Sequence, residues 1–95
     1  MTSEKLNELR IGIDDLDSKI IQLIADRFSL TRQVGQIKSH SNIDPVDPDR
    51  EEFVLDKWEK LAIDADVDPA LARALIRLII DQSVAEHRAV RQEGD

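Results

Sequence analysis

The sequence predicts an all-α fold of three helices, the first of them very long. Glycine, proline and aromatic residues are scarce, with three of each among 95 residues, which is unusual for a β-rich domain. Apolar residues recur at alternating steps of three and four throughout the first forty positions, and the strict alternation of a half-buried strand is missing. Hydrophobic residues make up 41% of the chain and charged residues 35%, a balance typical of one globular domain over residues 1–95.

The first helix is expected to begin near Ser3 or Glu4 and to end near His40. About 36 residues at about 1.5 Å each give a length of roughly 54 Å, whereas a compact domain of this size has a radius of gyration near 12 Å. Two shorter helices cannot cover such a seam, so a second copy should pack against it. The sequence therefore predicts a helical homodimer whose seam contains, in order, Leu6, Leu9, Ile13, Leu16, Ile20, Leu23, Arg27, Leu30, Val34 and Ile37.

Two later helices follow from repeated start signals. After a loop over 41–46, Asp47-Pro48 is typical of an N-cap followed by proline at the first helical position, and Asp68-Pro69 repeats it. We expect helices over 48–65 and 69–91. The side chains expected to face inward are Val54, Leu55, Trp58, Leu61 and Ala62 in the second helix, and Leu71, Leu75, Leu78, Ile79 and Val84 in the third.

Composition excludes several classes of protein. The absence of cysteine rules out disulfides and thiolate chemistry and fits a reducing cytoplasm. No apolar run approaches the roughly 20 residues of a membrane span, and no secretory signal is expected at the first residues. The net charge of -7 disfavours nucleic acid as a partner. All of it lies in residues 41–68, with ten acids and three bases, so a cationic site remains feasible elsewhere.

Two cations, Arg27 and Lys38, share one face of the predicted first helix. They are eleven positions apart, which places them about 20° from each other around the helix axis and about three turns apart along it. A small anion fits between them. The alternative for Arg27 is a side chain whose head reaches solvent past the apolar seam. Arg10 lies about 100° from this face, so it can serve only the pocket of a partner chain.

Further candidates lie on the other two helices. Ser83 and His87 are four positions apart and therefore present together, although a surface histidine and a hydroxyl bonded to its own turn are the simpler interpretations. Asp47, Arg50 and Glu51 open the second helix, where capping accounts for the two acids without any ligand. The acids over 64–68 begin with calcium-loop spacing but lack the glycine and the final glutamate, and no zinc motif is present. These motifs therefore predict neither a calcium nor a zinc site.

The order of these residues resembles the all-helical chorismate mutases (AroQ type). The resemblance covers the chain from Leu9 to about His87. Each segment is weak alone, and their order and spacing together are specific to the superfamily. The segments are Leu9-Arg10, Ile13-Asp14-Asp15-Leu16-Asp17, Ala25-Asp26-Arg27, Val34-Gly35-Gln36-Ile37-Lys38, Pro45-Val46-Asp47-Pro48-Asp49-Arg50-Glu51 and Leu78-Ile79-Ile80-Asp81-Gln82-Ser83-Val84.

The resemblance implies an intertwined homodimer that rearranges the dianion chorismate to prephenate, without metal or cofactor, in aromatic amino acid biosynthesis. It implies that Arg10 of the partner chain and Arg27 bind carboxylates and that Lys38 donates to the ether oxygen. Glu51 would accept from the C4 hydroxyl, and Ser83 would lie near the ring carboxylate. Asp47 and Arg50 match the group at the start of the second helix.

One position departs from the family pattern. His87 stands where many members have glutamine as the second donor to the ether oxygen, a change that bears on substrate choice and pH optimum. Relatives of this fold act as isochorismate pyruvate lyases or rearrange 4-amino-4-deoxychorismate, and both remain alternatives. So does a non-catalytic helical dimerisation or regulatory module, for which the pocket cations should be incomplete.

Overall fold

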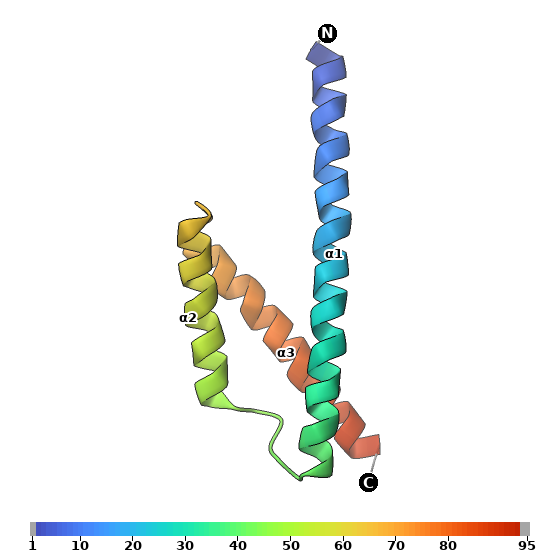
Figure 1. Cartoon of the computed structure of the whole chain (residues 1–95), viewed down its shortest axis with the longest axis vertical. Helices are drawn as coiled ribbons and strands as arrows, with labels where there is room; N and C mark the ends of the chain where they lie inside the picture. The colour runs from blue at the N-terminus through green and yellow to red at the C-terminus, as the bar shows by residue number, and fades with distance from the viewer. Residues whose placement is uncertain (1, 94–95) are drawn as a thin grey trace. The chain divides into compact units, whose positions relative to one another are not determined.

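The computed structural model describes residues 2–93 and is all-helical in this range, as predicted (Figure 1). Helix α1 spans Thr2–His40, α2 spans Pro48–Asp64 and α3 spans Pro69–Glu93. These bounds lie within one or two residues of the predicted ones. Residues up to Thr31 form one unit and residues from Arg32 onward form the second, so the boundary lies inside α1. None of the described helices is both long and apolar enough to cross a membrane.

Aspartate side chains cap both later helices, as the Asp-Pro pairs predicted. The Asp47 carboxylate accepts a hydrogen bond of 3.2 Å from the backbone N–H of Arg50, and Pro48 is the first residue of α2. The Asp68 carboxylate accepts one of 2.9 Å from the N–H of Ala70 at the start of α3. Each cap satisfies a backbone donor that has no partner within its own helix.

The two helix ends that precede these caps use a left-handed residue. Asn42 has a φ of 57° and Asp66 a φ of 60°. Beyond them, the N–H of Ile43 donates to the Lys38 carbonyl and that of Val67 to the Ala62 carbonyl, each at 2.8 Å. Asn and Asp tolerate this region better than other non-glycine residues. The chain therefore leaves α1 and α2 in sharp, hydrogen-bonded turns that fix where α2 and α3 begin.

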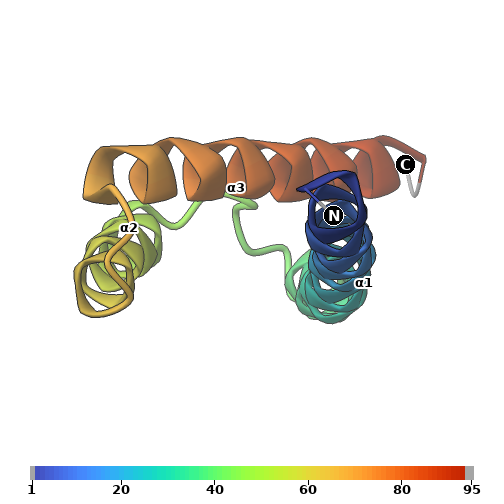
Figure 2. The same cartoon turned by 90° about the horizontal axis from the view of Figure 1, so that it is seen from above.

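The core of the second unit lies between α2 and α3, and Figure 2 shows α3 crossing one side of α2. Val54 and Leu55 of α2 pack with Ile76 and Ile80 of α3, and Ile76 is completely buried. Partly buried side chains surround this cluster, namely Trp58, Ile79 and Val84. Predicted inward positions such as Val54, Leu55 and Ala62 are thus confirmed.

The buried face of α3 differs from the predicted one, however. Leu71, Leu75 and Leu78 are all exposed, whereas Ala72, Ile76 and Ile80 are buried. Leu61 of α2 was also predicted to be buried and is exposed. The core contact with α2 uses the face of α3 that carries Ile76 and Ile80. Leucines on a second apolar face of α3 are left uncovered in the single chain.

Candidate functional site

The start of α2 holds three predicted site residues in a fixed order. The Asp47 carbonyl accepts from the N–H of Glu51 at 3.0 Å, in addition to the side-chain cap to Arg50. This places Arg50 and Glu51 on the first turn. The guanidinium of Arg50 lies 5.3 Å from the centroid of the Phe53 ring, a cation–π contact along the helix surface. Asp47 therefore has the structural role expected of it, and it orients its two neighbours.

Glu51 lines a pocket of about 290 Å³, and all residues that line this pocket belong to the second unit. The loop before α2 contributes Val46, and α3 contributes the remaining walls. The lining is partly apolar and carries charged groups of both signs, namely Glu51, Asp81 and Arg88 beside Val46, Val84 and Ala85. A pocket with an apolar wall and convergent charged groups suits a small polar ligand.

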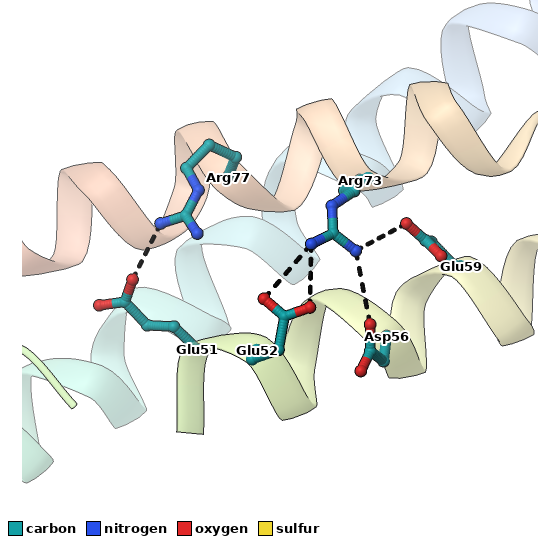
Figure 3. Close-up of polar contacts among 6 residues, drawn as sticks. All are labelled: Glu51, Glu52, Asp56, Glu59, Arg73 and Arg77. Atoms are coloured by element: carbon teal, nitrogen blue, oxygen red, sulfur yellow. Dashed lines mark hydrogen bonds and ion pairs between the residues drawn. The ribbon is translucent and has the colours of Figure 1, made fainter. Parts of the chain in front are cut away.

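Arg77 of α3 holds the Glu51 carboxylate across the helix pair (Figure 3). Its Nη1 donates to Oε1 of Glu51 at 2.9 Å and lies 3.5 Å from Oδ1 of Asp81. The Glu51 side chain is 19% exposed and that of Arg77 is 41% exposed. The hydrogen bond to Glu51, followed by the charges of Glu51 and Asp81, raises the pKa of Arg77 against the opposing effect of burial. Arg77 is therefore a firmly charged partner of Glu51.

Lys38 lies half-buried in the last turn of α1. Its Nζ donates to the backbone carbonyl of Pro45 at 3.4 Å, in the loop that leads to α2. A carbonyl is a neutral acceptor, so the ammonium charge stays uncompensated by this contact. Lys38 thus lies next to the loop that supplies Val46 to the pocket.

His87 packs directly against the backbone of Gly35. A Cβ atom added at Gly35 would meet Cδ2 of the imidazole and would lie 2.7 Å from Nε2. Gly35 is the only buried residue among the described positions of α1. The missing side chain of this glycine is therefore what allows the imidazole of α3 to approach α1.

Ser83, one turn before His87, is buried at 6% exposure. Its Oγ donates to the Ile79 carbonyl at 3.1 Å. This is the hydroxyl-to-own-turn bond that was the simpler interpretation from the sequence. For Ser83 to donate to a ligand, the hydroxyl hydrogen has to turn away from that carbonyl.

A bidentate ion pair connects the C-terminal part of α1 with α3 next to His87. Arg32 donates from Nε and Nη2 to the two oxygens of Glu86, at 3.0 and 3.1 Å. The hydrogen bond from Arg32 is the largest cause of a lowered pKa of Glu86, and burial opposes it. The pair fixes α3 against α1 one residue before the imidazole.

Arg10 and Arg27 belong to the unit that ends at Thr31. Arg10 is exposed and Arg27 is partly buried. The contacts described above all lie within the second unit, which also holds every predicted site residue from Lys38 onward. The approach of Arg10 and Arg27 to them remains a prediction.

Sequence reasoning missed two residues of this site. Gly35 gave a signal, because a glycine inside a helix costs about 1 kcal/mol relative to alanine and suggests a close approach. Arg77 gave none, since nothing in a single sequence indicates that α3 turns this position toward the start of α2.

Comparison with known proteins adds independent findings. The family model described as chorismate mutase type II matches residues 9–88. A protein named chorismate mutase from Methanocaldococcus jannaschii is 36% identical over 90 residues, which cover 95% of this chain and 91% of that protein.

Two longer relatives match as well. The bifunctional chorismate mutase/prephenate dehydratase of Escherichia coli is 36% identical over 98% of this chain and 24% of its own length. A protein named T-protein from Haemophilus influenzae is 37% identical over 78% of this chain and 21% of its own length. The chain therefore spans nearly all of one relative and about a quarter or less of the other two.

Proposed function

We propose that this chain acts as a single-domain homodimer. It belongs to the chorismate mutase type II family and is a chorismate mutase, an isomerase of aromatic amino acid biosynthesis. The reaction is the [3,3] rearrangement of chorismate to prephenate. It needs no nucleophile: the enzyme selects a compact conformer of a dianion and stabilises the charge that develops on the breaking ether oxygen. The family match over residues 9–88 carries this conclusion.

Cations supply the binding in this proposal. Arg27 binds one carboxylate of the substrate, and a bidentate guanidinium is well suited to that role. Arg10 of the partner protomer reaches the other carboxylate. Lys38 donates to the ether oxygen. Its half-buried ammonium donates to the neutral Pro45 carbonyl at 3.4 Å in the free protein, which supports that role. Exchanging a neutral acceptor for a developing oxyanion strengthens its hydrogen bond.

The polar groups of α2 and α3 orient the ring. Glu51 accepts from the C4 hydroxyl, and its position in the wall of the pocket supports this role. His87 is the second donor to the ether oxygen, and Ser83 lies near the ring carboxylate. Asp47 and Arg50 shape the entrance at the start of α2, where the cap of Asp47 fixes the first turn.

The dimer would be intertwined through α1. The residues of its apolar seam are exposed in the single chain, from 44% at Leu6 to 66% at Leu23. About 39 residues of helix with an uncovered apolar seam need a second surface, and a copy of the same helix offers one. The proposed compartment is the cytoplasm, since a chain without cysteine suits a reducing environment.

The test is the absorbance of chorismate mixed with the purified chain, followed by identification of the product. Disappearance of chorismate with accumulation of prephenate is expected. Release of free pyruvate would indicate a lyase instead, and an unchanged substrate would indicate a non-catalytic module. Activity measured in the presence of a chelator checks that no metal takes part.

A further inference from the structure

The hydrogen bond between Arg77 and Glu51 connects a residue outside the expected site with one inside it. We propose that Arg77 is a positioning residue for the reaction, which holds the Glu51 carboxylate in the orientation that accepts the C4 hydroxyl of the substrate. This inference rests on the proposed role of Glu51. It assigns a function to a position of α3 that the family resemblance does not include.

The geometry allows the Glu51 carboxylate to accept from Arg77 and from the substrate at the same time. Nη1 of Arg77 reaches Oε1 at 2.9 Å, and a carboxylate offers about four acceptor positions on its two oxygens. One donor from α3 thus restrains the side chain without using its capacity to accept from a ligand. Since Glu51 is on the first turn of α2 and Arg77 is in the middle of α3, the bond also sets the carboxylate relative to the pocket wall.

Charge gives Arg77 a second effect on Glu51. The guanidinium lies between Glu51 and Asp81, and so it compensates both carboxylates that line the pocket.

Arg73, one turn earlier on α3, provides a matched control. It binds three carboxylates of α2, with Glu52 at 3.0 Å, Asp56 at 3.4 Å and Glu59 at 2.7 Å (Figure 3). None of these acids lines the pocket. Arg73 thus joins the same two helices more extensively than Arg77 does, without touching a predicted site residue.

The experiment compares Arg77→Gln, Arg73→Gln and Glu51→Gln by steady-state kinetics and thermal unfolding of the full chain. The C4 hydroxyl is present in both substrate and transition state. Replacing its charged acceptor by a neutral amide oxygen therefore weakens uniform binding, which raises KM and leaves kcat nearly unchanged. We expect KM for chorismate to rise about ten-fold in Arg77→Gln and at least as much in Glu51→Gln. Arg73→Gln should lower Tm more than Arg77→Gln and leave KM unchanged.

A double variant separates positioning from an independent contact. Arg77→Gln added to Glu51→Gln should raise KM no further, because Arg77 acts only through Glu51. A further ten-fold rise would overturn the inference, and so would a wild-type KM in Arg77→Gln beside a raised KM in Glu51→Gln. A wild-type KM in Glu51→Gln would overturn the assigned role of Glu51, and a chain inactive on chorismate would overturn the proposed function; the inference falls with either.

If Arg77→Gln does not fold, Arg77→Lys carries the same test. Lysine keeps the charge between α2 and α3 but lacks the planar fork, so the carboxylate is held less firmly. A KM above that of the wild type is expected. A KM equal to it, with kcat reduced in proportion to the folded fraction, would show that the residue has only a structural role.

Discussion

Gly35 controls the position of His87 through the side chain that it lacks. In Gly35→Ala, the new Cβ would occupy space now taken by the imidazole. We expect the ring to move and the unfolding free energy to fall by about 1–3 kcal/mol, as in other overpacked sites. If His87 donates to the ether oxygen, kcat should also fall about ten-fold or more. Kinetics and thermal unfolding of the variant test both effects.

Gly12 is the matched control for this substitution. A Cβ there would meet nothing within 4 Å in the single chain. Gly12→Ala should therefore stabilise α1 by about 1 kcal/mol, the difference in helix propensity, and leave kcat unchanged. Equal kcat values in the two alanine variants would show that His87 takes no part in the reaction.

Apart from the arginines, Lys38 should be the residue whose substitution causes the largest loss of activity. A charged donor to a developing oxyanion stabilises the transition state by about 3–4 kcal/mol, so Lys38→Ala should lower kcat about 10²- to 10³-fold. Lys38→Arg should not restore it, because a planar fork differs in shape from a point charge. Turnover of Lys38→Ala close to that of the wild type would disprove the assignment to the ether oxygen.

Among the helices, the pair of Arg32 and Glu86 connects α1 with α3 and makes their contact depend on pH. The pKa of Glu86 is lowered in the folded chain, so the pair stabilises the fold at neutral pH. This stabilisation is lost as pH falls below the ordinary value of 4.5 and through the lowered folded value. We expect Glu86→Gln to lower Tm at pH 7 by less than about 5 °C, since Arg32 is well exposed and the pair is screened.

Thermal unfolding of Glu86→Gln and of the wild type over a range of pH checks this sign. The two Tm values should converge toward pH 3, and the difference at pH 7 should shrink in high salt. A constant difference at every pH would mean that the substitution acts through packing. Glu8→Gln is a suitable control, because Glu8 lies 3.9 Å from Lys5 in an exposed pair within α1.

The elements themselves followed from local rules, and their packing faces did not. Asp47 and Asp68 mark the helix starts because capping depends on neighbours in the sequence. Leu71, Leu75 and Leu78 were predicted inward because they form an apolar stripe, but α3 carries two such stripes and α2 packs against the other. Which stripe a neighbour uses depends on residues far away in the sequence. The same reason hid the contact of Arg77 with Glu51, whereas the resemblance alone supplied the roles of Arg10 and Ser83.

For the whole molecule, the exposed apolar residues of α1 and α3 raise the question of what covers them. Two adjacent isoleucines of α1 offer a test of whether a partner chain packs along the apolar seam. Ile20 lies on the three-and-four repeat and is 53% exposed, while Ile21 lies about 100° away and is 66% exposed. Exposure of the single chain therefore does not separate them, and only a partner packed along the seam would make them different.

Ile20→Lys should weaken the dimer and Ile21→Lys should not. A lysine in a dimer seam places its charge against apolar residues of the partner, or forces the helices apart, whereas at Ile21 the ammonium remains in water. Sedimentation should give a dimer for the wild type and Ile21→Lys and a smaller or unfolded species for Ile20→Lys. Since a dimer is stabilised by mass action, the Tm of the wild type should also rise with protein concentration. Activity should follow the dimer fraction, because Arg10 is expected to act only across the interface. A fully active monomer, or equal effects of the two lysines, would exclude this assembly.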